Sequence, residues 1–149
     1  TTCSLGTLSA ATTGSCSHTM TAASNATSGY TISYISSATL TSGGNTITAN
    51  GASAVANAVG GEQFGLNLRA NTTPTVGADK SGDTTPTIAT NYNVANSFSF
   101  APSVATTIAT TAAPSGVTTI TVSYIANISS ATEAGLYTKT QTYNITATY

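Results

Sequence analysis

The sequence predicts an all-β domain, specifically an immunoglobulin-like β-sandwich of about eight or nine strands with one long loop. Thr, Val, Ile and Tyr alternate along several stretches, with the period of a strand that buries one face. Clusters of Gly, Ser, Asn and Pro separate these stretches at short intervals, as turns do. A length of 149 residues suits one domain with its own core, here residues 1–149.

Alternation of apolar residues predicts six strands in the first half of the chain. They cover residues 3–9, 15–22, 29–35, 39–41, 46–49 and 63–70. The first two flank the turn 11–14 as a hairpin, and the fourth and fifth flank the Gly-containing turn 42–45. Residues 52–59 are Ala-rich and could instead form a short helical turn that Gly60 and Gly61 would end.

The second half combines a long loop with the strongest strand patterns. Residues 71–90 show no periodicity, and a stretch of that length is usually an exposed or functional loop. The pattern resumes in the expected strands 91–100, 117–128 and 136–149. In the last of these, Thr alternates with apolar residues. Its apolar face, a candidate assembly surface, comprises Tyr137, Tyr143, Ile145 and Tyr149, together with Ala147.

Charge is scarce throughout the chain. Charged residues make up 5% of the sequence, whereas an ordinary soluble domain carries about 25%. Thr, Ala and Ser fill the difference, with 33, 24 and 19 copies, and the formal net charge is -1. Arg69, Lys80 and Lys139 are too few to follow a phosphate backbone, which argues against nucleic acid as a partner. A nearly neutral surface favours self-association, so we expect a homo-oligomer.

The cysteines and the chain start indicate a secreted protein. Cys3 and Cys16 flank the expected first hairpin, and a disulfide between them would stabilise the fold by about 3 kcal/mol. Two free thiols are the alternative. A chain that starts at Thr1 without Met suggests a removed signal peptide or a trimmed start, and no apolar run is long enough to span a membrane.

The sequence offers little for catalysis, and we expect neither an enzyme nor a cofactor. His18 is the one histidine, and only two of the four acidic residues are near each other. Asp79, Ser81 and Asp83 have the alternating spacing of a calcium loop, but the later Gly and Glu of such loops are missing. A polar turn is therefore the alternative to a weak calcium site.

Four sequons are candidates for glycosylation if the source organism modifies such sites. They begin at Asn25, Asn71, Asn127 and Asn144. Triplets of this kind also arise by chance in a chain so rich in Thr and Asn.

Three segments resemble a group of uncharacterised secreted Thr/Ala-rich surface proteins of candidate-phyla bacteria. They are EQFGLNLRANTTPTVGAD (62–79), NYNVANSF (91–98) and VSYIANISSATEAGLYT (122–138). That group has no established activity, so the resemblance implies a cell-surface context alone.

The C-terminal segment GLYTKTQTYNITATY (135–149) is similar to the last strand of pilins that polymerise by donor-strand exchange. Those pilins share a Gly about a dozen residues from the end, alternating apolar residues and a final Tyr, and many carry an early disulfide. This chain departs from them because only Thr1 and Thr2 precede Cys3. The resemblance implies assembly through exchanged strands, and it leaves open which strand is donated.

Taken together, these patterns predict a structural subunit of an extracellular filament or pilus that assembles by β-strand addition. The alternative is a cell-surface adhesin or an S-layer-like module that contacts its target, such as a glycan, through residues 71–90. Both hypotheses place the protein at the cell surface.

Overall fold

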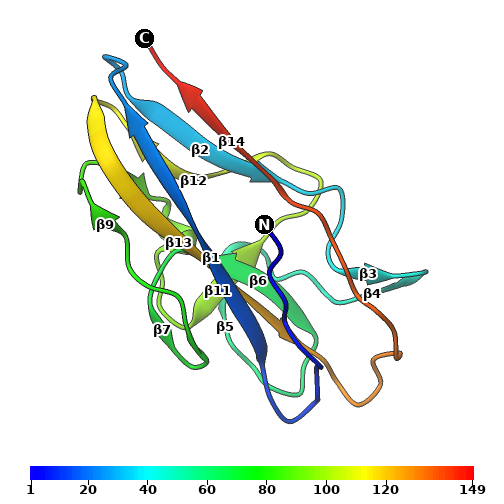
Figure 1. Ribbon diagram of the computed structural model, residues 1–149. Coiled ribbons are helices and arrows are strands. Elements are labelled where there is room, and N and C mark those ends of the chain that lie inside the picture. Colours follow the sequence, from blue (N-terminus) through cyan, green and yellow to red (C-terminus); the bar gives the residue numbers. More distant parts are fainter.

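The chain forms two antiparallel sheets that pack face to face, as the computed structural model of residues 1–149 shows (Figure 1). Eight strands have four residues or more: β1 (Gly14–Ser24), β2 (Tyr30–Ile35), β5 (Gly51–Ala56), β6 (Gln63–Asn67), β11 (Ser97–Phe100), β12 (Thr106–Thr111), β13 (Ser115–Asn127) and β14 (Thr142–Ala147). The predicted all-β sandwich is confirmed.

The larger sheet has the strand order β1-β13-β6-β11-β5, and the smaller sheet has the order β10-β12-β2-β14. The short strand β9 (Ser81–Gly82) also pairs with β13, beside β6. β10 (Thr87–Ile88) is the short edge strand of the smaller sheet. The outermost strands are therefore β1 and β5 in the larger sheet, and β10 and β14 in the smaller one. The end of β5 lies against the start of β1, where Asn57 and Thr13 are hydrogen-bonded.

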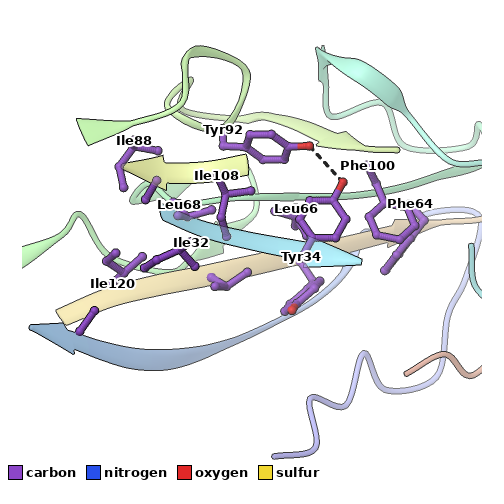
Figure 2. Packing of buried hydrophobic residues seen from close by; sticks show 14 of the residues in the cluster. Ile32, Tyr34, Phe64, Leu66, Leu68, Ile88, Tyr92, Phe100, Ile108 and Ile120 are labelled. Atoms are coloured by element: carbon purple, nitrogen blue, oxygen red, sulfur yellow. Dashed lines mark hydrogen bonds between the residues drawn. The ribbon is translucent and has the colours of Figure 1, made fainter. Parts of the chain in front are cut away.

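The core lies between the two sheets. Along β13, every second residue from Thr118 to Ala126 faces the smaller sheet, and the apolar ones join the core cluster with side chains of β2, β6 and β12. Tyr34 stacks on Phe100 with ring centroids 5.4 Å apart and shares a hydrogen bond with the hydroxyl of Tyr92 (Figure 2). That bond satisfies two buried hydroxyls inside an otherwise apolar interior.

The outer face of the larger sheet is also buried. Ile125 and Ser123 on β13 and Asn67 on β6 are fully covered, although they point away from the core. The loop between β6 and β11 lies over part of this face, where Ser123 Oγ donates to the carbonyl of Arg69. A strand buried on both faces carries a continuous apolar and small-residue pattern, which explains why β13 gave such a strong prediction.

Several predicted elements differ from those observed. Residues 3–9 are not a strand, because Gly6 has a φ of 72° and the segment makes no backbone hydrogen bonds to the sheets. Residues 52–59 form no helical turn; residues 51–56 are the strand β5, because pairing with β11 outweighs the helix propensity of Ala. Residues 91–100 divide into a 3₁₀ turn (Thr90–Tyr92) and β11.

The segment 71–90 was expected to be an unstructured loop. It contains four short strands: β7 (Asn71–Thr72) and β8 (Thr75–Val76), which form a hairpin, and then β9 and β10. The Thr73–Pro74 peptide bond in this hairpin is cis. The hairpin around residues 42–45 is confirmed as β3 (Thr41–Ser42) and β4 (Asn45–Thr46).

The C-terminal strand is shorter than the predicted range 136–149. β14 begins at Thr142 and pairs antiparallel with β2 of the same chain from Thr142 to Ala147. Before it, Thr138 makes one isolated bridge to Thr41, and residues 128–141 otherwise have no strand.

Candidate functional site

Three long edge strands present unpaired backbone groups and carry no charge. β1, β5 and β14 each pair with one neighbour only, and none of the three contains Asp, Glu, Lys, Arg or Pro. Natural sandwiches usually protect such edges with charged side chains, proline or very short strands. The edges of these three strands are therefore the candidate interaction surface.

The fourth edge is protected. β10 has two residues, and Pro86 immediately precedes it. The Lys80 ammonium donates hydrogen bonds to the carbonyls of Thr84, at 2.6 Å, and Pro86. The short strand, the proline and the charged Lys80 side chain all oppose pairing with another strand at this edge.

The predicted assembly residues lie in different environments. Ile145 on β14 is 55% exposed although it faces the space between the sheets, and Tyr149 is 89% exposed beyond the end of the strand. Tyr143 is half-buried. Tyr137 lies before β14, where its hydroxyl donates to the carbonyl of Glu133 at 2.8 Å. Only Tyr143 and Ile145 therefore belong to the edge strand itself.

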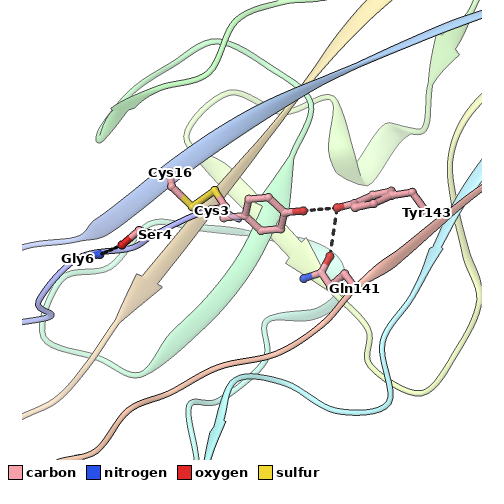
Figure 3. Close-up of a disulfide and its surroundings, with 7 residues drawn as sticks. Cys3, Ser4, Gly6, Cys16, Gln141 and Tyr143 are labelled. Atoms are coloured by element: carbon pink, nitrogen blue, oxygen red, sulfur yellow. Dashed lines mark hydrogen bonds between the residues drawn. A yellow bond between two sulfur atoms is a disulfide. The ribbon is translucent and has the colours of Figure 1, made fainter. Parts of the chain in front are cut away.

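The disulfide between Cys3 and Cys16 is present, as predicted (Figure 3). It holds the N-terminal segment beside the start of β1, where Leu5 and Leu8 pack against the core. Because residues 1–8 make no backbone hydrogen bonds to the sheets, the disulfide and these two leucines are what hold the segment.

Next to the disulfide, His18 lies between two tyrosines. Its ring stacks on Tyr124 and meets Tyr143 edge-on, with centroids 5.6 Å away in both cases. The hydroxyls of Tyr124 and Tyr143 are hydrogen-bonded to each other, and Tyr143 also donates to Gln141 Oε1 at 3.1 Å (Figure 3). This cluster links β1, β13 and β14 on the side of the sandwich where the β1 and β14 edges lie.

Burial shifts the pKa values of the three side chains in this cluster. Desolvation, and secondly the N-terminal ammonium, lower the pKa of His18 below 6.5. Desolvation raises the pKa of Tyr124 to about 12 and raises that of Tyr143 as well. In the folded protein, all three groups therefore favour their neutral forms.

We predict a stability plateau between about pH 6.5 and pH 10. Below pH 6.5 the unfolded chain protonates His18 more readily than the folded one, so the free energy of unfolding falls. Above pH 10 the unfolded tyrosines ionise first, and the shift at Tyr124 alone costs about 2 kcal/mol of stability by pH 12. Tyr143 and Tyr92, whose pKa values burial also raises, add to this loss. Urea unfolding measured from pH 4.5 to pH 11.5 checks both limbs.

Two variants test the assignment of each limb. His18→Gln is expected to flatten the decline between about pH 6.5 and pH 5, and Tyr143→Phe to reduce the alkaline one. The two aspartates titrate below this range, because hydrogen bonds lower the pKa values of Asp79 and Asp83 below 3.8. An unchanged acid limb in His18→Gln would contradict the role given to the imidazole.

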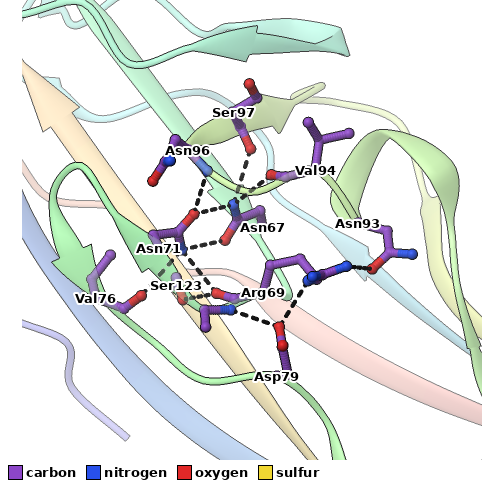
Figure 4. Close-up of polar contacts among 11 residues, drawn as sticks. Asn67, Arg69, Asn71, Val76, Asp79, Asn93, Val94, Asn96, Ser97 and Ser123 are labelled. Atoms are coloured by element: carbon purple, nitrogen blue, oxygen red, sulfur yellow. Dashed lines mark hydrogen bonds and ion pairs between the residues drawn. The ribbon is translucent and has the colours of Figure 1, made fainter.

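A second cluster of asparagines fastens the β7–β8 hairpin to the larger sheet (Figure 4). The buried amides of Asn67 and Asn71 bond to each other in both directions, at 2.7 and 2.9 Å. Asn67 Nδ2 also donates to the carbonyls of Val94 and Ser97, and Asn71 Nδ2 donates to those of Arg69 and Val76. Asn96 completes the cluster by accepting from the backbone amides of Thr72 and Thr73. The loop is thus held in place by buried polar contacts.

Asp79 and Asp83, proposed with Ser81 as a weak calcium site, bond to different partners. Asp79 accepts hydrogen bonds from Arg69 Nε at 2.7 Å and from the backbone amide of Ala70 at 3.0 Å. Asp83 accepts from Thr85 and from the amide of Gly116, while Ser81 lies in β9. The geometry matches the alternative interpretation, a polar turn, in which both carboxylates stabilise loops.

The four sequons fall into two groups. Asn25 and Asn144 are exposed. Asn71 and Asn127 are 5% and 1% exposed, and the Nδ2 atoms that would carry a glycan are hydrogen-bonded inside the protein. The prediction for these two is wrong for the folded chain, because attachment would require breaking the buried contacts.

No sequence pattern indicated the structural role of Asn67 and Asn96. Both lie within the segments 62–79 and 91–98 that carry the family resemblance, but neither follows a strand or turn pattern that would assign a partner. Asn96 has a φ of 60°, a left-handed conformation that Asn tolerates better than most residues. The residue type at position 96 was therefore the one local signal in the sequence.

Comparisons with known proteins add no assignment. No family model, no curated protein and no solved structure matches this chain. None of its helices is long and apolar enough to cross a membrane, and no group of three His, Cys, Asp or Glu side chains is placed to hold a metal ion.

Proposed function

We propose that this protein is a structural subunit of an extracellular filament, assembled by pairing of sheet edges between identical copies. The observation that carries the proposal is the absence of charge and proline from β1, β5 and β14. An exposed edge of this kind is a template for another strand, since its N–H and C=O groups gain partners on pairing.

Side-chain chemistry favours a structural role over catalysis. His18 is enclosed by tyrosine rings, and Asp79 is paired with Arg69. Glu62 accepts hydrogen bonds from Thr48 and Thr132. These contacts connect loops and strands, so His18, Asp79 and Glu62 each have a structural contact. The disulfide supports an oxidising location such as the cell surface.

The proposal predicts concentration-dependent assembly that is insensitive to salt. Backbone pairing between uncharged edges gains nothing from ion pairs, so raising NaCl from about 20 to about 500 mM should leave the assembly unchanged. Sedimentation velocity combined with negative-stain microscopy measures this. A monodisperse monomer at every concentration and temperature would overturn the proposal, and assembly that dissolves with salt would contradict the edge mechanism.

A second candidate, an adhesin or surface module, is favoured by the fastened β7–β8 hairpin. The asparagine cluster holds this hairpin firmly while Thr72, Thr73 and Thr75 stay exposed, which suits a preorganised contact loop. Binding of the isolated monomer to glycans or cell surfaces, lost in Thr73→Ala with Thr75→Ala, would support this alternative.

A further inference from the structure

The C-terminal part of the chain lies on the outside of the sandwich. The last buried residue in the sequence is Asn127, and none of residues 128–149 is buried. β14 borders a single strand, β2, at the edge of the smaller sheet (Figure 1). Ile145 and Tyr149 are 55% and 89% exposed. β14 can therefore leave the sandwich without taking a fully buried side chain out of the core.

The segment between β13 and β14 is long and lightly attached. Residues 128–141 contain no strand, and Leu136 among them is 82% exposed. Their one β-bridge to the rest of the chain joins Thr138 to Thr41. Fully extended, these 14 residues span about 46–50 Å, whereas a domain of this size is about 40 Å across. The segment is therefore long enough to carry β14 from one copy to a neighbouring one.

The place beside β2 fits β14 through specific contacts. Six consecutive residues, Thr142–Ala147, pair in register with β2. Towards the space between the sheets, the Tyr143 ring meets His18 of β1 edge-on, and its hydroxyl is hydrogen-bonded to that of Tyr124 on β13. β14 of a second copy has the same side chains and would make every one of these contacts. The partner that this site is shown to fit is therefore an identical strand.

We propose that β14 is the strand exchanged in the filament: each copy places its β14 beside β2 of the next copy and receives the β14 of the preceding one. This inference rests on the proposed function and names the strand that joins the subunits. The assembled state keeps every contact of β14, so protein concentration decides the balance between closed monomer and assembly. Because each copy gives to one neighbour and accepts from another, the exchange continues as an open chain.

The test uses paired cysteines in the full chain that record which copy supplies β14. Ser33 on β2 and Asn144 on β14 are register partners on the outer face of the smaller sheet, so Ser33→Cys with Asn144→Cys brings two thiols together outside the core. Thr31→Cys with Thr146→Cys is a second pair in the same strands. The matched control, Ser33→Cys with Thr107→Cys, joins β2 to β12, which stays in place. Circular dichroism and thermal unfolding establish that each variant folds.

When the β2–β14 variants are oxidised after assembly, we expect a ladder of covalent multimers on a nonreducing gel, whereas the control yields monomers with an internal bond. Oxidation of the dilute monomer should instead lock β14 onto its own β2 and abolish assembly, while the oxidised control still assembles. Filaments with internal bonds alone would overturn the inference and leave the proposed function intact. Covalent dimers without higher multimers would also overturn it, because reciprocal exchange closes the assembly. A wild-type chain that never assembles would overturn both.

Discussion

Replacing Asn67 by alanine is expected to lower the free energy of unfolding by about 4 kcal/mol. The Asn67 amide is fully buried and bonds to Asn71 and to the carbonyls of Val94 and Ser97. Its removal takes away four hydrogen bonds, two shared with Asn71 and one each to the carbonyls of Val94 and Ser97, and each is worth about 1 kcal/mol net. Guanidinium unfolding of the variant measures the loss.

The comparison with Asn71 separates the amide pair from the rest of the cluster. Asn71→Ala should cost a similar amount, but the double variant should cost clearly less than the sum, because each amide is the other's partner. Asn144→Ala, which alters an exposed asparagine on β14, is the control and should stay within about 0.5 kcal/mol of the wild type. Additive losses for Asn67 and Asn71 would contradict the reciprocal pair.

The fold class followed from alternation, because half-buried strands leave a period of two in the sequence. β2, β6 and β13 were placed nearly to their boundaries, since their inward residues, such as Ile32, Leu66 and Val122, are fully or almost fully buried. β5 and β12 were not identified as strands. Their small Ala, Ser and Thr side chains pair well in a sheet but give no apolar signal, so only their partners define them.

The candidate site was predictable in part. Scarcity of charge is a property of composition, and it indicated self-association before any strand order was known. Which strands form those edges depends on long-range pairing, as when β1 meets β13 a hundred residues later, and short-range patterns contain no such information. The asparagine cluster could not be predicted for the same reason, because Asn71 and Asn96 become neighbours only after β11 pairs with β6.

The turn before β2 is the tightest point of the smaller sheet. Gly29 has a φ of 75°, and a Cβ added there would lie 2.1 Å from the carbonyl oxygen of Thr111 and 2.9 Å from the amide of Ala113. Both are backbone atoms, so no side chain can rotate away. The carbonyl of Gly29 also accepts a hydrogen bond from the amide of Thr148, which fixes the end of the β14 edge.

Gly29→Ala is therefore expected to cost about 3–4 kcal/mol: about 1–2 kcal/mol for the left-handed backbone and the remainder for displacing β12. Gly43→Ala is the matched control. Gly43 also has a positive φ, 59°, but no atom lies within 4 Å of its added Cβ, so only the backbone cost of about 1 kcal/mol should remain. Thermal and urea unfolding compare the two variants, and equal losses would show that the contact with Thr111 carries no extra cost. Because the displaced turn also holds Thr148, hydrogen exchange at the β14 amides should accelerate in Gly29→Ala and stay unchanged in Gly43→Ala.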